Sequence, residues 1–231
     1  MGAGYTALMS ALWILFSLAA FSILHSALAS LGAKALARQW LGQRTADGIY
    51  RLLYNVIATL TVVPPLILAV LLPDGAPVWH LPTPLLFITI PLQLVALAAM
   101  VISLWRVDLP RFIGLRQFFR LWVGEAEPRD PPVLRTDSIH GWVRHPLYFF
   151  SLVVIWLLPA MTPNLLALNI GVTVYFWIGS IFEERKLVQD FGEVYRAHQR
   201  RVPRLLPTPS SLVAALRRER SARLPDKPVR R

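Results

Sequence analysis

The sequence predicts an all-α polytopic membrane protein with five transmembrane helices, an N-terminus outside and a C-terminus in the cytoplasm. Three observations lead to this fold class. Of the 231 residues, 55% are hydrophobic and only 16% are charged, whereas soluble domains carry about 25% charged residues. The apolar residues also form long uninterrupted blocks, and ~20 of them in a row cross the ~30 Å hydrocarbon layer.

Five apolar segments are predicted to cross the membrane, although the fourth is shorter than the others. They run from Tyr5 to Leu31, Leu52 to Leu72, Leu81 to Leu104, Leu147 to Leu158 and Leu165 to Phe182. Pro64 and Pro65 are expected to bend the second segment, because proline removes a helical hydrogen bond. The last two segments are joined by Pro159 to Asn164, whose two prolines and Asn predict a tight turn between antiparallel helices.

The positive charges predict the orientation. All 24 Lys and Arg fall in three stretches, Lys34 to Arg51, Arg106 to Arg144 and Arg185 to Arg231. The loops around Asp74 and Pro163 contain none of them. Because basic loops stay in the cytoplasm, we expect the basic stretches on the cytoplasmic side and the loops around Asp74 and Pro163 outside. The protein is expected to be a multi-pass protein of the bacterial inner membrane. The bases are expected to contact anionic lipids.

Composition also narrows the function. The net charge of +11 comes without a nucleic-acid recognition fold, so no nucleic-acid partner is expected. The absence of cysteine excludes disulfides, thiolate metal sites and a cysteine nucleophile, and no metal site is predicted. The oligomeric state stays open.

Four regions are expected along the chain. Residues 1–104 form a three-helix transmembrane region, 105–145 a cytoplasmic interfacial segment, 146–207 a helix hairpin with a cytoplasmic segment, and 208–231 a basic mobile tail. In the second region, Leu109 to Val123 is expected to form a helix lying in the interface. Its large apolar residues recur at helical spacing, and they are Phe112, Leu115, Phe119 and Trp122.

The residues that suggest chemistry lie at the cytoplasmic mouth of the hairpin. Gly141, Arg144, His145, Pro146 and Tyr148 precede or begin the fourth segment, and Glu183, Glu184 and Arg185 end the fifth. The two helices of a hairpin open on the same side, so these groups are expected to converge. A rise of 1.5 Å per residue places His145 and Glu183 ~9 Å apart in depth, which suits an elongated ligand better than a metal ion.

The same residues allow two interpretations. Glutamates could hold the ammonium of a sulfonium cofactor such as S-adenosylmethionine, while Arg, His or Tyr could meet its carboxylate, ribose or adenine. Alternatively, they could be ordinary interfacial residues, with the arginines reaching towards the headgroups.

The order of the motifs resembles a known family. Arg144-His145-Pro146-x-Tyr148, Glu183-Glu184-Arg185-x-Leu187, Phe191-Gly192-x-x-Tyr195 and Arg201-Val202-Pro203 are similar to the isoprenylcysteine carboxyl methyltransferase family. Phe112 to Gln117 and the turn Pro159 to Thr162 resemble its bacterial methanethiol S-methyltransferase branch.

This resemblance implies an S-adenosylmethionine-dependent membrane methyltransferase, with His145, Tyr148 and the Glu183/Glu184 pair in the cofactor pocket. Its acceptor is expected to be a small thiol or lipid-like molecule. Gly141, Arg144 and Pro146 are expected to complete the pocket. Arg185, Tyr148 or a glutamate could assist deprotonation of a thiol acceptor.

The N-terminal half is similar to a different group. His25-Ser26-x-Leu28 and Tyr50-Arg51-Leu52-x-Tyr54-Asn55 resemble NnrU-type membrane proteins, a group that includes carotene isomerases. This resemblance implies, as an alternative function, a haem-binding membrane protein or isomerase with haem held by histidines. His25 and then His145 would be the ligands. If the protein is a methyltransferase, His25 is expected to serve helix packing. A non-catalytic membrane subunit is the third alternative.

Overall fold

The computed structural model describes residues 2–105, 108–125, 134 and 138–215. These residues are almost entirely helical, which confirms the all-α prediction. The α-helices are α1 (Gly2–Ala29), α2 (Leu31–Leu41), α3 (Gln43–Leu71), α4 (Thr83–Trp105), α5 (Leu109–Ile113), α6 (Leu115–Trp122), α7 (Pro146–Trp156), α8 (Pro163–Phe191) and α9 (Glu193–Arg201). A 3-10 helix, η1 (Ser138–Gly141), and two short strands, β1 (Trp79–His80) and β2 (Ala160–Met161), complete them.

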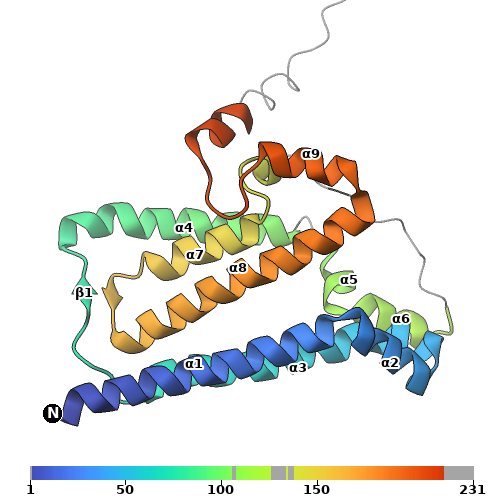
Figure 1. Cartoon of the computed structure of the whole chain (residues 1–231), viewed down its shortest axis with the longest axis horizontal. Helices are drawn as coiled ribbons and strands as arrows, with labels where there is room; N and C mark the ends of the chain where they lie inside the picture. Colours follow the sequence, from blue (N-terminus) through green and yellow to red (C-terminus); the bar gives the residue numbers. More distant parts are fainter. Residues whose placement is uncertain (1, 106–107, 126–133, 135–137, 216–231) are drawn as a thin grey trace, which may run out of the picture.

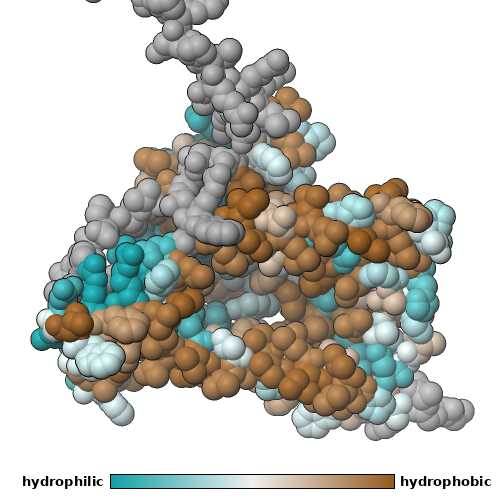
Figure 2. Space-filling view, turned by 180° about the vertical axis from the view of Figure 1, so that it is seen from behind, coloured by the Kyte–Doolittle hydropathy of each residue, from teal (hydrophilic) through white to brown (hydrophobic). Residues whose placement is uncertain are grey.

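Four of these helices, α1, α3, α4 and α8, are long and apolar enough to cross a membrane. The fourth predicted segment corresponds to α7, which is apolar but has only 11 residues. Large apolar side chains on the outer faces of the long helices are exposed, including Val70 at 77% and Phe87 at 79%. Figure 2 shows this apolar surface running along the helices. Such a surface suits contact with lipid.

The helices form two layers joined by α8. In Figure 1, α1 and α3 lie together below, α4 and α7 lie above, and α8 runs obliquely between them. The core between α1, α3 and α8 consists of Ile14, Leu18, Phe21, Ala69 and Leu168. Gly171 allows α8 to approach α1, because a Cβ there would meet the side chain of Leu18 at 2.5 Å. The core therefore holds the N-terminal helices to the hairpin.

The two uncharged connections meet at one end of the molecule. β1 pairs with β2 in an antiparallel register, Trp79 opposite Met161. Asn164 donates its side-chain amide to the carbonyl of Leu72, and its backbone N–H to the carboxylate of Asp74. The connection between α3 and α4 is thus fixed to the turn between α7 and α8, so both lie at the same end of the molecule.

The predicted helix from Leu109 to Val123 is not continuous. It is divided into α5 and α6 at Gly114, whose φ of 93° lies in the left-handed region. A Cβ at this position would collide with the backbone of α3, 2.9 Å from the carbonyl carbon of Arg51. The break therefore lets the chain pass close to α3, which sequence periodicity alone does not reveal.

The end of the described chain folds back onto the segment before α7. Residues 209–215 are helical, and the hydroxyl of Ser211 donates to the carbonyl of Trp142 at 3.0 Å. Ser211 is buried. The first residues of the predicted tail thus contact the segment between η1 and α7, while residues 216–231 lie outside the described part.

Candidate active site

The candidate site lies where the start of α7 meets α8 and the segment after α9. Pro146 occupies the first turn of α7, where its missing N–H is tolerated, and His145 is the N-cap residue, without a side-chain capping hydrogen bond. The backbone N–H groups of Arg144 and His145 donate to the carbonyls of Pro203 and Arg204, at 2.9 and 3.2 Å. This pairing brings the residues before α7 and after α9 against α8.

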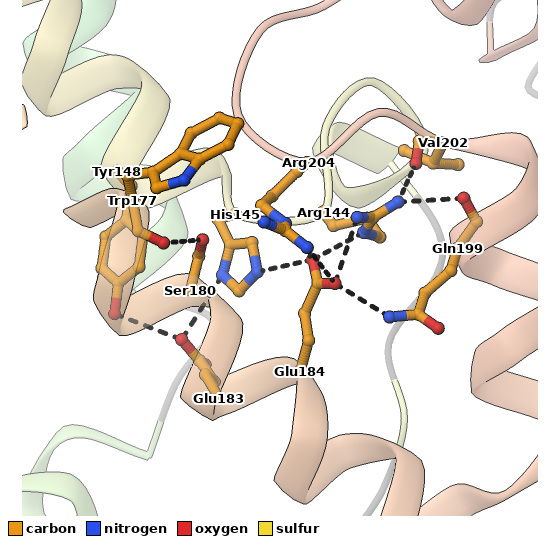
Figure 3. A network of polar contacts seen from close by, with 10 residues as sticks. All are labelled: Arg144, His145, Tyr148, Trp177, Ser180, Glu183, Glu184, Gln199, Val202 and Arg204. Atoms are coloured by element: carbon orange, nitrogen blue, oxygen red, sulfur yellow. Dashed lines mark hydrogen bonds and ion pairs between the residues drawn. The ribbon is translucent and has the colours of Figure 1, made fainter. Parts of the chain in front are cut away.

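Arg144 and Glu184 form the buried centre of the site (Figure 3). The Nε of Arg144 lies 2.7 Å from Oε1 of Glu184, and Nη2 lies 3.1 Å from Oε2. Nη1 donates to the carbonyls of Gln199 and Val202. The side chains of Arg144 and Glu184 are only 10% and 3% exposed. They form a bidentate ion pair that is almost completely shielded from solvent.

Glu184 accepts further hydrogen bonds from other elements. The amide of Gln199 on α9 donates at 2.8 Å, and the guanidinium of Arg204 donates at 3.3 and 3.4 Å. Arg204 also lies over the ring of Trp177, 5.4 Å from its centre. Glu184 therefore has its partners within the protein and connects three segments of chain.

His145 lies between the two glutamates. Its Nδ1 is 3.3 Å from Oε2 of Glu183, and its Nε2 is 3.2 Å from Oε1 of Glu184. Burial lowers the pKa of His145, but the hydrogen bonds to both carboxylates and their charges outweigh burial, so the pKa lies above its ordinary value. The imidazolium form would donate to both carboxylates at once.

Glu183 and Tyr148 form the open side of the site. The Tyr148 hydroxyl donates to Oε2 of Glu183 at 3.2 Å, and the Glu183 side chain is 50% exposed. The ring of Tyr148 is stacked between those of His145 and Phe176, with centres 5.3 and 4.6 Å away. Neighbouring glutamates thus differ sharply: Glu184 is enclosed, and Glu183 presents a carboxylate at an aromatic surface.

The structure brings most of the predicted residues together. Figure 3 shows Arg144, His145, Tyr148, Glu183 and Glu184 in one network. Gly141 ends η1 and, like Pro146, is buried beside them.

Arg185 is not part of that network. Its guanidinium lies over the ring of Phe182, 5.4 Å from the centre, and its side chain is exposed.

The predicted ~9 Å separation in depth between His145 and the glutamates is wrong, since the imidazole contacts both carboxylates. That separation requires the whole path from His145 to Met161 to be helical. In the structure α7 ends at Trp156, and the non-helical residues that follow advance ~3.3 Å each instead of 1.5 Å. His145 therefore reaches the level of Glu183.

Gln199 and Arg204 contribute to the site but were not predicted. Arg204 directly follows the Arg201-Val202-Pro203 motif, so its position in the sequence was a usable signal. Gln199 lies on α9, where nothing in the sequence distinguishes it from its polar neighbours. Among the described residues, no cluster of three or more His, Asp or Glu could hold a metal ion.

Comparison with known proteins finds several methanethiol S-methyltransferases and, at 28% identity over 68 residues, covering 29% of this chain and 24% of that protein, Nurim of Xenopus laevis. The chain is 30% identical over 196 residues to methanethiol S-methyltransferase 1 of Bradyrhizobium diazoefficiens, covering 84% of this chain and 65% of that protein. It is 34% identical over 112 residues to the methanethiol S-methyltransferase of Mycobacterium tuberculosis, covering 48% and 45%. It is 41% identical over 83 residues to the methanethiol S-methyltransferase of Pseudomonas deceptionensis, covering 36% of this chain and 31% of that protein.

The chain thus spans less than two thirds of the length of these relatives. No protein-family model and no solved structure matches it. The relatives confirm the resemblance to the isoprenylcysteine carboxyl methyltransferase-like membrane family, and with the apolar helices they indicate a multi-pass membrane protein. The NnrU-like features of the N-terminal half stay a prediction.

Proposed function

We propose that this chain, a homologue of the bacterial methanethiol S-methyltransferases, is an S-adenosylmethionine-dependent methyltransferase acting on a small thiol at the cytoplasmic membrane interface. The observation that carries the proposal is the pairing of Glu183 with Tyr148. This half-exposed carboxylate lies beside aromatic rings and is backed by the buried Arg144–Glu184 pair.

The residues present fit such a cofactor. Glu183 would hold the ammonium of its amino-acid part through a charge-assisted hydrogen bond. The face of Phe176 that is turned away from Tyr148 would lie against its positive charge, which aromatic rings attract. Glu184 and Arg144 already have their partners in the protein, so we assign them to positioning.

The sulfonium of the bound cofactor supplies an electrophilic methyl group. The protein must then hold the acceptor in line with that group, and such positioning contributes ~7–11 kcal/mol at its upper end. Tyr148 keeps the Glu183 carboxylate in place, and the buried network fixes the start of α7 against α8. The guanidinium of Arg185 lies over the ring of Phe182, outside the network of the site, so the proposal gives it no catalytic role.

The proposed topology has five crossings, with the N-terminus outside and the site at the cytoplasmic face of a bacterial inner membrane. The 11 residues of α7 span only about 16 Å. The non-helical residues 157–162 add up to ~3.3 Å each, enough to complete a crossing of ~30 Å. The basic segments would contact anionic lipids on the same side.

Calorimetric titration with S-adenosylhomocysteine tests the cofactor site. Loss of a hydrogen bond to a charged group is worth about 1.5–3 kcal/mol, so Glu183→Gln should weaken binding ~10- to 150-fold. Glu193→Gln is the matched control, since Glu193 lies on α9 with its side chain 71% exposed and paired with Arg196. Equal affinities of the two variants would contradict the assignment.

A further inference from the structure

A second polar pair lies in the apolar N-terminal half, away from the glutamates. The hydroxyl of Tyr54 on α3 is 2.6 Å from Nε2 of His25 on α1. In contrast, the hydroxyl of Tyr50, one turn earlier on α3, donates to the carbonyl of Leu28 at 2.6 Å. A hydroxyl and an imidazole in contact can pass a proton between them, whereas a hydroxyl held by a carbonyl only fixes two helices.

Ring contacts connect this pair to the candidate active site. The ring of His25 lies 6.1 Å from that of Tyr175 on α8. Tyr175 lies 5.9 Å from Phe176, which stacks on Tyr148 at 4.6 Å. The phenol groups of Tyr54 and Tyr175 are also close enough to interact electrostatically with Tyr148. His25 is therefore a spatial neighbour of the site, although it is far from the site motifs in sequence.

The side chains of the two pairs and the ring of Tyr175 are not fully enclosed by protein. His25, Tyr54, Tyr175 and Tyr148 are all only partly buried. From behind, the surface is hollowed between the layer of α1 and α3 and the layer of α4 and α7 (Figure 2). Aromatic walls with one hydroxyl–imidazole pair suit a small apolar molecule that carries a single weakly acidic group.

We propose that the methyl acceptor binds in this region and that the Tyr54–His25 pair removes the proton from its thiol. This inference rests on the proposed function. The S–H bond breaks, the thiol proton binds to the Tyr54 oxygen, and the phenolic proton moves to Nε2 of His25. Sulfur keeps the electron pair as a thiolate, and His25 becomes an imidazolium, so charge and atoms balance.

The chemistry of thiols requires such a group. An ordinary thiol has a pKa of ~8.5 and is mostly protonated at neutral pH, while the thiolate is the nucleophile. The titratable groups that face the imidazole of His25 are Tyr54 from α3 and Tyr175 from α8. A base at this place would provide the thiolate next to the surface proposed for the methyl donor.

The test measures the rate of methyl transfer to methanethiol from pH 6 to 10. It compares the variants Tyr54→Phe and His25→Gln with the control Tyr50→Phe. General-base catalysis contributes about 10²- to 10⁴-fold. Tyr54→Phe and His25→Gln should lose at least ~100-fold at neutral pH and recover as the thiol ionises by itself. Tyr50→Phe should keep the wild-type profile, because its hydroxyl has only a structural partner.

A second readout does not depend on turnover. Methanethiol added at pH 7 to protein loaded with S-adenosylhomocysteine should produce the ultraviolet absorption of a thiolate in the wild type and in Tyr50→Phe. The band should be absent in Tyr54→Phe and His25→Gln, with S-adenosylhomocysteine affinity unchanged in all variants. If Tyr54→Phe fails to fold, His25→Gln carries the test, since its amide can still bond to Tyr54.

Two outcomes would overturn the inference. One is a wild-type pH profile of methyl transfer in both Tyr54→Phe and His25→Gln. The other is a loss of activity in Tyr50→Phe as large as the loss in those two variants. A wild-type protein that neither binds S-adenosylhomocysteine nor transfers a methyl group would instead overturn the proposed function. Normal binding and transfer with no effect of Tyr54 or His25 would leave the methyltransferase proposal standing without this base.

Discussion

Oε1 of Glu184 lies 2.7 Å from Nε of Arg144, and both side chains are almost completely withdrawn from solvent. The pair joins the segment before α7 to the C-terminal half of α8. Because α9 and Arg204 also bond to Glu184, one carboxylate holds together the segments that form the site. Glu183, the preceding residue, contacts only Tyr148 and His145 through Oε2 and keeps half of its side chain exposed.

Glu184→Gln should therefore reduce the stability of the fold more directly than the affinity for the cofactor. The substitution leaves Arg144 buried without a countercharge, and breaking a buried ion pair from one side costs about 3–5 kcal/mol. We expect a large fall in the unfolding midpoint of the purified protein in detergent. Glu183→Gln should change it little, because that side chain is half exposed. Equal midpoints of wild type and Glu184→Gln would contradict the role of Glu184.

The stability should also depend on pH through His145. Its folded-state pKa lies above the ordinary value, which is ~6.5 in the unfolded chain. The stabilisation is therefore fully present below about pH 6.5 and is lost as the pH rises through the folded-state pKa. Unfolding midpoints measured across this range should fall more for the wild type than for His145→Gln. If the unfolding midpoints of the wild type and His145→Gln change in parallel with pH, the pKa of His145 does not differ between the folded and unfolded states.

Tyr195 presents a different case, since its hydroxyl is buried and has no hydrogen-bond partner. A buried hydroxyl left unsatisfied costs about 1–3 kcal/mol, so Tyr195→Phe should raise the unfolding midpoint. Tyr50→Phe should lower it, because the Tyr50 hydroxyl donates to Leu28. A destabilised Tyr195→Phe variant would show that this hydroxyl has a partner in solution.

The topology can be tested with reporter fusions. β1 and β2 bring the loop after α3 and the turn before α8 together at one end of the molecule. The basic segments predict that the opposite end faces the cytoplasm. Fusions after Asp74 and Pro163 should report an outside location, and a fusion after Pro207 a cytoplasmic one. A cytoplasmic signal at Asp74 would contradict the five-crossing arrangement.

The apolar segments of the sequence were sufficient to locate the long helices, because each such segment must cross a lipid layer. They did not predict where the helices end. α3 begins at Gln43, well before the apolar segment at Leu52, since charged residues can extend a helix into the interface. The break at Gly114 depends on the approach of α3, which is a tertiary contact without a local pattern.

The motifs located the site but not the roles of its residues. Adjacent residues on a helix point ~100° apart, so one of Glu183 and Glu184 must be enclosed when α9 packs against α8. Which one is enclosed depends on how α8 is rotated about its axis. The contact between His25 and Tyr54 likewise depends on the register of α1 against α3. A single sequence contains neither quantity.

The most direct test of the account is transfer of an isotope-labelled methyl group from S-adenosylmethionine to methanethiol by the purified protein in lipid. We expect labelled thioether from the wild type and from Glu193→Gln, and at least ~10-fold less from Glu183→Gln at limiting cofactor. Absence of labelled product from a folded wild-type protein that also fails to bind S-adenosylhomocysteine would contradict the proposed function.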